Sequence, residues 1–98
     1  MDVSEKVAAL KVWLSDRMGA EVATHFESKA TTYWFRILVG VRPQPVLCVS
    51  LRAFEDHSVE KISNDLERQQ VPGMLVSDPA QHLLYTTRGE VEKYDDPS

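Results

Sequence analysis

Cysteine is scarce in this chain. Its 98 residues include one, Cys48, so the chain cannot form an internal disulfide, and we expect it to work in a reducing, cytoplasmic compartment. Basic residues are also in the minority, with 11 Lys and Arg against 15 Asp and Glu and a net charge of −4. This balance argues against binding to nucleic acids, which requires clustered basic residues. Long apolar runs are absent as well, so no membrane association is expected.

The composition is that of a globular protein. Apolar residues make up 43% of the chain and charged residues 27%, which excludes a largely disordered protein. The length suits one domain with a single core. We expect this domain to cover residues 1–93, and we expect residues 94–98 to form a flexible tail.

The first element is predicted to be an amphipathic helix. Its apolar residues recur at steps of three and four, as on one face of a helix. Asp2 is the expected N-cap, with Glu5 three residues further on, and Gly19 is the expected stop. Basic and acidic side chains offset each other on the other face, so we interpret this helix as packing on a core.

Three strands are predicted for EVATHFES, TYWFRILVGV and VLCVSLRAF, because these segments alternate with a period of two. The turns between them are SKAT and RPQP, whose prolines cannot continue a strand ladder. One register brings the apolar residues of all three strands onto the same face. It sets Glu27 opposite Thr32 in the first hairpin and Phe35 opposite Leu51 in the second.

The remaining chain completes an α+β fold. A second helix should carry Val59, Ile62 and Leu66 on one face, with Asp56 or Ser58 as its N-cap. GMLV and HLLYTT are predicted as two short strands, and EVEKY either adds an edge strand or frays. The prediction is a single domain with an antiparallel sheet, two helices on one face and the element order α-β-β-β-α-β-β.

The stretch LCVSLRAFEDHS brings a cysteine, two acids and a histidine close together in the sequence. We expect Cys48 within a strand and His57 beyond the end of that strand, too far apart to share a proton. The three histidines and Cys48 lack the close spacing of a zinc site, and the four glycines form no phosphate loop. No catalytic residue, metal or cofactor is therefore predicted.

The sheet face turned away from the helices is the candidate site. Trp and Arg are enriched at interface hot spots, so we expect this face to bind a protein partner, either a second copy in a homodimer or another protein. Two alternatives stay open: the face is covered within the monomer, or it forms a small-molecule site or the active site of a small enzyme. The candidate residues are His25, Trp34, Arg36, Leu38, Cys48 and Arg52.

The predicted order α-β-β-β-α resembles that of double-stranded RNA-binding domains. Those domains have basic residues at the start of the second helix, where this chain has FEDHSVEK, so RNA binding is not expected. The order, the acidity and the small size are also similar to those of type III secretion chaperones, which are dimers that bind an effector segment. No motif of either family carries over residue by residue, and no family is assigned.

Overall fold

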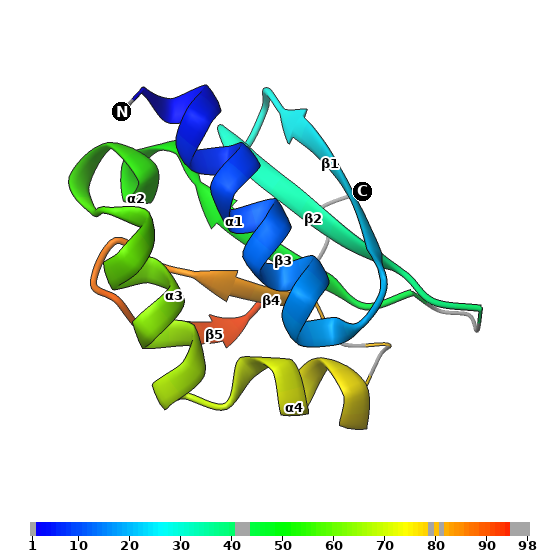
Figure 1. Ribbon diagram of the computed structural model, residues 1–98. Coiled ribbons are helices and arrows are strands. Elements are labelled where there is room, and N and C mark those ends of the chain that lie inside the picture. Colours follow the sequence, from blue (N-terminus) through cyan, green and yellow to red (C-terminus); the bar gives the residue numbers. More distant parts are fainter. Residues whose placement is uncertain (1, 41–43, 79, 81, 95–98) are drawn as a thin grey trace.

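The computed structural model describes residues 2–40, 44–78, 80 and 82–94. Its elements follow one another as α1 (Val3–Met18), β1 (Glu21–Glu27), β2 (Thr32–Leu38), β3 (Val46–Ser50), α2 (Leu51–Asp56), α3 (Val59–Arg68), α4 (Val71–Ser77), β4 (His82–Tyr85) and β5 (Val91–Lys93) (Figure 1). The predicted fold class, a single α+β domain, is confirmed.

The strands form one sheet in sequence order, β1-β2-β3-β4-β5. Three neighbouring pairs are antiparallel, whereas β4 runs parallel to β3. The sheet is therefore mixed, and the prediction of an antiparallel sheet is wrong on this point. The chain between β3 and β4 forms three helices, and a crossover of this kind allows two neighbouring strands to run in the same direction.

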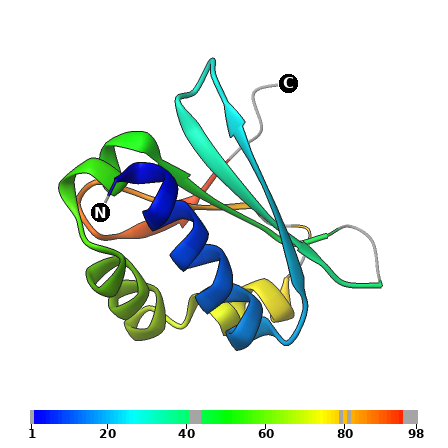
Figure 2. The same ribbon diagram turned by 45° about the horizontal axis from the view of Figure 1, so that its top comes forward.

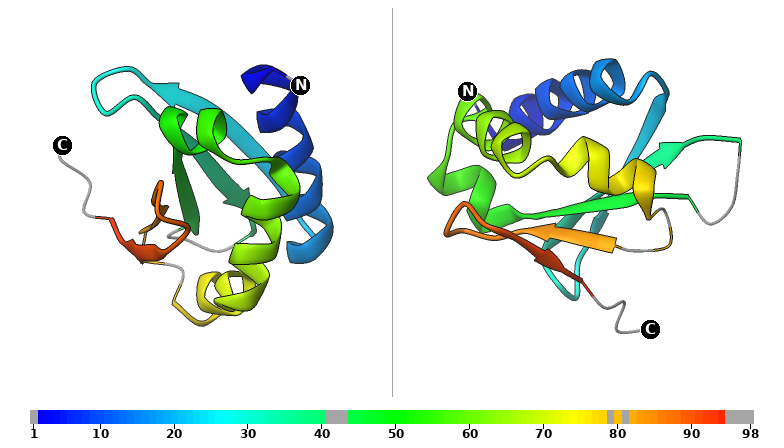
Figure 3. Two further views of the ribbon diagram at one scale, coloured as in Figure 1. Left: turned by 90° about the vertical axis from the view of Figure 1, so that its left-hand side faces the viewer. Right: turned by 90° about the horizontal axis from the view of Figure 1, so that it is seen from below.

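The helices cover one face of the sheet (Figure 3). We call this the inner face and the opposite one the outer face. The sequence predicted two helices here, and the structure has four. All four contribute to the main core, together with alternate strand residues: Leu10, Leu14, Val22, Phe35, Ile37, Leu47, Val49, Ala53, Phe54, Ile62, Leu66, Val71, Leu75, Leu83 and Tyr85.

Segment GMLV, predicted as a strand, belongs to α4. Gln70 has a left-handed backbone with a φ of 58°, which redirects the chain after α3. Pro72 stands in the first turn of α4, where its missing N–H breaks no helical hydrogen bond. Val71 and Leu75 are buried in the core. A short apolar run suits a strand or a buried helix equally, and here tertiary packing decides for the helix.

The register of the first hairpin is the predicted one, with Glu27 opposite Thr32. In the second hairpin Phe35 lies opposite Leu47, not opposite Leu51 as predicted. Leu51 is not part of the strand at all, because Ser50 ends β3 by capping α2, with its Oγ accepting a hydrogen bond from the N–H of Ala53 at 3.1 Å. The difference is four residues, an even number, so the predicted faces of β2 and β3 are preserved.

The predicted helix caps are confirmed at both ends of α1. A carboxylate oxygen of Asp2 accepts a hydrogen bond from the N–H of Glu5 at 2.8 Å, and Gly19 ends the helix with a φ of 63°. Of the two predicted caps for the helix that carries Ile62, Ser58 is the one observed.

A buried carboxylate fastens α3 to β4. Asp65, only 3% exposed, accepts a hydrogen bond from the Tyr85 hydroxyl at 2.6 Å. Lys61 and Arg68 each form an ion pair with it at 2.9 Å. Burial by itself raises the pKa of Asp65, but the hydrogen bonds from Tyr85 and Lys61 and the charges of Lys61 and Arg68 outweigh it, so the pKa lies below its usual value.

The neighbouring Gln69 extends this connection to the hairpin between β4 and β5. Its side-chain N–H donates to the carbonyl of Gly89 at 2.8 Å, and its side-chain oxygen accepts from the N–H of Val91 at 2.9 Å. α3 thus holds the hairpin that brings β5 to the edge of the sheet.

Candidate functional site

The register places side chains from all five strands on the outer face. They are Glu21, Ala23, His25 and Glu27 of β1, Thr32, Trp34, Arg36 and Leu38 of β2, Val46, Cys48 and Ser50 of β3, His82 and Leu84 of β4, and Glu92 of β5, followed by Tyr94. Five of the six predicted site residues are in this set. The exception is Arg52.

Arg52 lies on α2, not on a strand, so its predicted place on the outer face is wrong. Its side chain is 76% exposed and lies 3.5 Å from the carboxylate of Asp56, one helical turn further on. The cap at Ser50, which ends β3 two residues earlier, is the cause.

Part of the outer face is covered within the monomer. Trp34, predicted to be exposed, is 7% exposed and forms a second small core with Val46 and Cys48. Leu84 and Tyr94 pack against this core. We name these five residues the Trp34 cluster.

Rings surround Trp34 on three sides. Their centroids lie 5.4 Å away for His25, 5.4 Å for His82 and 6.1 Å for Tyr94, and the last two rings meet the indole edge-on. Tyr94 was predicted to start the flexible tail, and its backbone N–H donates to the carbonyl of His82 at 2.9 Å. Residues 95–98 of that tail lie outside the described residues.

The indole N–H of Trp34 is buried and has no hydrogen-bond partner among the described residues. The covering of Trp34 depends on strands far away in the sequence. Leu84 of β4 lies opposite Cys48, on the same face of the sheet. The alternation with a period of two within HLLYTT already indicated which side chains of this strand share a face with Leu84.

Cys48 is fully buried, so the expectation of an exposed thiol on the outer face is wrong. His57 lies at the C-terminal end of α2, where its Nε2 is 2.7 Å from the carbonyl oxygen of Thr87 and its ring meets that of Tyr85. Since Tyr85 is on the inner face, Cys48 and His57 are on opposite sides of the sheet. Within the part of the chain that the structure describes, no group of three or more His, Cys, Asp and Glu side chains is placed to hold a metal ion.

Apart from Glu92 of β5, the exposed side chains of the outer face lie on β1 and β2. We give the name β1–β2 patch to four of them, Ala23, His25, Arg36 and Leu38. Leu38 is 39% exposed, which is high for an apolar side chain of its size, and it lies opposite Glu21. Arg36 lies opposite Ala23, and its guanidinium forms no ion pair or hydrogen bond with any described residue.

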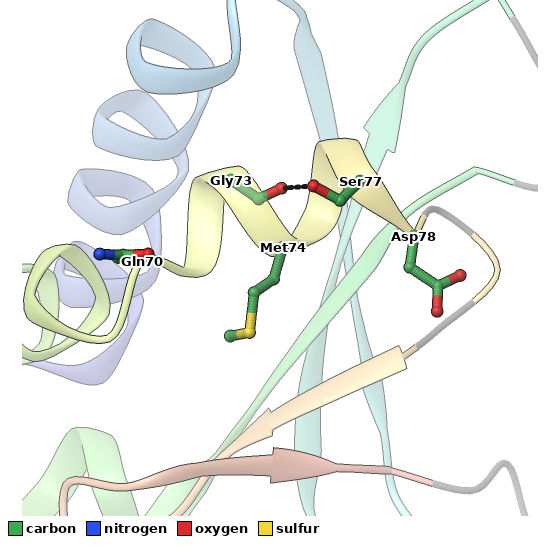
Figure 4. Close-up of a pocket in the computed structure, with 5 residues that line it drawn as sticks. All are labelled: Gln70, Gly73, Met74, Ser77 and Asp78. Atoms are coloured by element: carbon green, nitrogen blue, oxygen red, sulfur yellow. Dashed lines mark hydrogen bonds between the residues drawn. The ribbon is translucent and has the colours of Figure 1, made fainter.

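Two pockets lie away from the β1–β2 patch. The first, of about 290 Å³, is lined by Gln70, Gly73, Met74, Ser77 and Asp78. Figure 4 shows Met74 and Asp78 projecting from the same side of α4, while Ser77 bonds back to the carbonyl of Gly73. The second, of about 500 Å³, is lined by Lys6, Glu55, Asp56, His57, Ser58, Val59 and Glu60. Neither pocket includes a predicted site residue.

None of the helices in the described ranges is both long enough and apolar enough to cross a membrane. No protein-family model, curated protein or solved structure matches the chain. A function has to be argued from the geometry of the chain itself.

Proposed function

We propose that this chain is a noncatalytic protein-binding module that docks its partner on the β1–β2 patch. The observation that carries the proposal is the exposure of Leu38 and Arg36 side by side on a sheet face that no helix covers. Arg is one of the residue types enriched at interface hot spots, and the exposed Leu38 adds an apolar contact beside it. The Trp34 cluster lies beside these residues on the same face, where its packing joins β2 to β3.

The proposed partner is a protein and not a nucleic acid. The patch combines Arg36 and His25 with the carboxylates of Glu21 and Glu27 at its border, so its charge is mixed. A phosphate backbone requires a predominantly basic surface. We place the module in the cytoplasm, because its one cysteine is buried and the described chain relies on packing, not on disulfides.

A pair of variants tests this proposal. Arg36→Glu combined with Leu38→Glu should abolish partner capture from an extract of the native host, because it would bury unpaired charge in the contact. Val12→Glu is the matched control: Val12 is 62% exposed on α1, in the helical layer. Captured proteins are identified by mass spectrometry for the parent and both variants.

The expected result is a set of proteins retained by the parent and by Val12→Glu and lost with the double variant, whose circular dichroism and urea midpoint match the parent. Equal capture by all three proteins would refute the patch as the docking surface. Unfolding of the double variant would show that these side chains belong to the packing of the monomer.

A further inference from the structure

β1 forms an edge of the sheet along its seven residues. Figure 2 shows the tip of the β1–β2 hairpin projecting beyond the helical layer. An edge strand presents a row of unpaired backbone N–H and C=O groups, and proteins usually block such an edge with Lys, Pro, a bulge or a very short strand. The other edge follows this rule, since β5 has three residues. β1 contains no Lys or Pro, and its pairing with β2 runs without a bulge.

Side chains of this edge strand are exposed on both faces of the sheet. On the inner face Phe26 is 45% exposed, with its ring centroid 4.8 Å from that of Tyr33. On the outer face Ala23 and His25 are exposed. An unblocked edge with an exposed aromatic side chain fits the addition of another strand.

A second copy of the chain can pair with β1 in an antiparallel sense about a two-fold axis. In each register one residue lies opposite the same residue of the other copy, and we name the axis after that residue. The possible registers differ in which charged side chains they set opposite each other. An axis through Thr24 sets Glu21 opposite Glu27 of the other copy twice, which is unfavourable. An axis through Ala23 sets the two Arg36 side chains in the same row, with only the two Ala23 residues between them and no carboxylate in that row.

An axis through His25 gives the complementary arrangement. Ala23 then faces Glu27 of the second copy. Arg36 of β2 lies opposite Ala23 of β1. The Ala23 methyl group is too small to keep the Arg36 guanidinium apart from the Glu27 carboxylate of the second copy. By symmetry this ion pair occurs twice. The same register sets Glu21 opposite Lys29 of the second copy.

The inner face of this arrangement is apolar. Phe26 lies opposite Thr24 of the second copy, and the two Phe26 side chains become diagonal neighbours, within reach for aromatic rings. The exposed Phe26 ring thereby gains a cover that the monomer does not provide.

We propose that β1 pairs antiparallel with β1 of a second copy, with the two-fold axis at His25, so that two five-stranded sheets become one continuous sheet. The surface is the β1 edge, and Arg36 to Glu27 is its defining contact. This inference rests on the proposed function, since it names the second copy as the protein partner.

Disulfide trapping tests the register. Residues directly opposite in an antiparallel pair have Cα atoms about 4.5–5.5 Å apart, within the range that a disulfide spans. His25→Cys should therefore form a covalent dimer under mild oxidation. Ala23→Cys is the matched control, because Ala23 is also exposed on the same strand but lies roughly 14 Å from its symmetry mate. Cys48 is buried in both variants.

A charge exchange tests the defining contact. In sedimentation equilibrium, Glu27→Arg should raise the dimer dissociation constant on the order of tenfold, and adding Arg36→Glu should restore it. Within one copy Glu27 lies opposite Thr32 and Arg36 opposite Ala23, so the rescue has no source inside the monomer.

Equal trapping of the two cysteine variants, or a parent that stays monomeric at about 1 mM, overturns the self-pairing. If the parent is monomeric while the Arg36→Glu, Leu38→Glu variant still loses a captured protein, self-pairing fails and the docking proposal stands. If neither self-association nor capture is found, both proposals fail.

Discussion

Asp65→Asn is the most informative single change, because it keeps the shape of a buried side chain and removes its charge. The Tyr85 hydroxyl donates to Asp65 at 2.6 Å in a fully shielded position. A buried hydrogen bond to a charged group contributes about 1.5–3 kcal/mol. The ion pairs with Lys61 and Arg68 add little, because both basic side chains are about half exposed or more. The Asn oxygen can still accept from the Tyr85 hydroxyl but without the charge, so we expect a loss of about 1–3 kcal/mol in the free energy of unfolding at pH 7.

The pH dependence of this decrease in the free energy of unfolding is the stronger test. The folded pKa of Asp65 lies below its ordinary value, chiefly because the Tyr85 and Lys61 hydrogen bonds outweigh burial. The carboxylate therefore stabilises the fold above about pH 4, and this contribution disappears as the pH falls through the folded pKa. Asn does not titrate, so the difference between parent and variant should shrink in acid.

Urea unfolding followed by circular dichroism, at neutral pH and at about pH 2–3, measures this difference. Tyr85→Phe is the companion variant, and a double-variant cycle isolates the coupling between the hydroxyl and the carboxylate. A cost below about 0.5 kcal/mol at neutral pH, or a cost that does not change with pH, would refute the stabilising role assigned to the charge.

Two further changes are predicted to act through packing. Gly89→Ala should cost more than Gly19→Ala: both glycines have positive φ, but a Cβ at Gly89 would lie 2.9 Å from the Asp65 carboxylate, whereas no other group lies within 4 Å of one at Gly19. Thermal melting compares them, and equal midpoints would contradict the contact. Cys48→Ser should lower stability by about 1–3 kcal/mol, because it places a hydroxyl at a fully buried position; an unchanged urea midpoint would show that the site accepts a polar group.

Local patterns in the sequence were sufficient to predict the elements that depend on neighbouring residues. The cap at Asp2, the stop at Gly19 and the register of Glu27 with Thr32 are all as predicted. Each follows from contacts only a few residues apart, or from an alternation that a slip of one residue would reverse.

Features that depend on distant contacts were not predicted. The parallel pairing of β3 with β4 joins residues on the two sides of a three-helix crossover, and no local pattern indicates it. The same pairing buries Trp34 and Cys48, because it brings Leu84 alongside β3. Arg52 was misplaced for a different reason: a single hydroxyl, that of Ser50, ends the strand earlier than the apolar pattern alone suggests.

The two tryptophans lie on different sides of the sheet, and this gives the chain two separate optical reporters of folding. Trp13 packs with the helical layer, whereas Trp34 is enclosed in part by residues that follow the crossover, Leu84 and Tyr94. β4 can pair with β3 only after the long loop between them closes, and such non-local pairing is slow. During synthesis Trp34, Val46 and Cys48 therefore face water until the last strands dock. The Trp13 signal should mature first, and that of Trp34 should mark completion of the sheet.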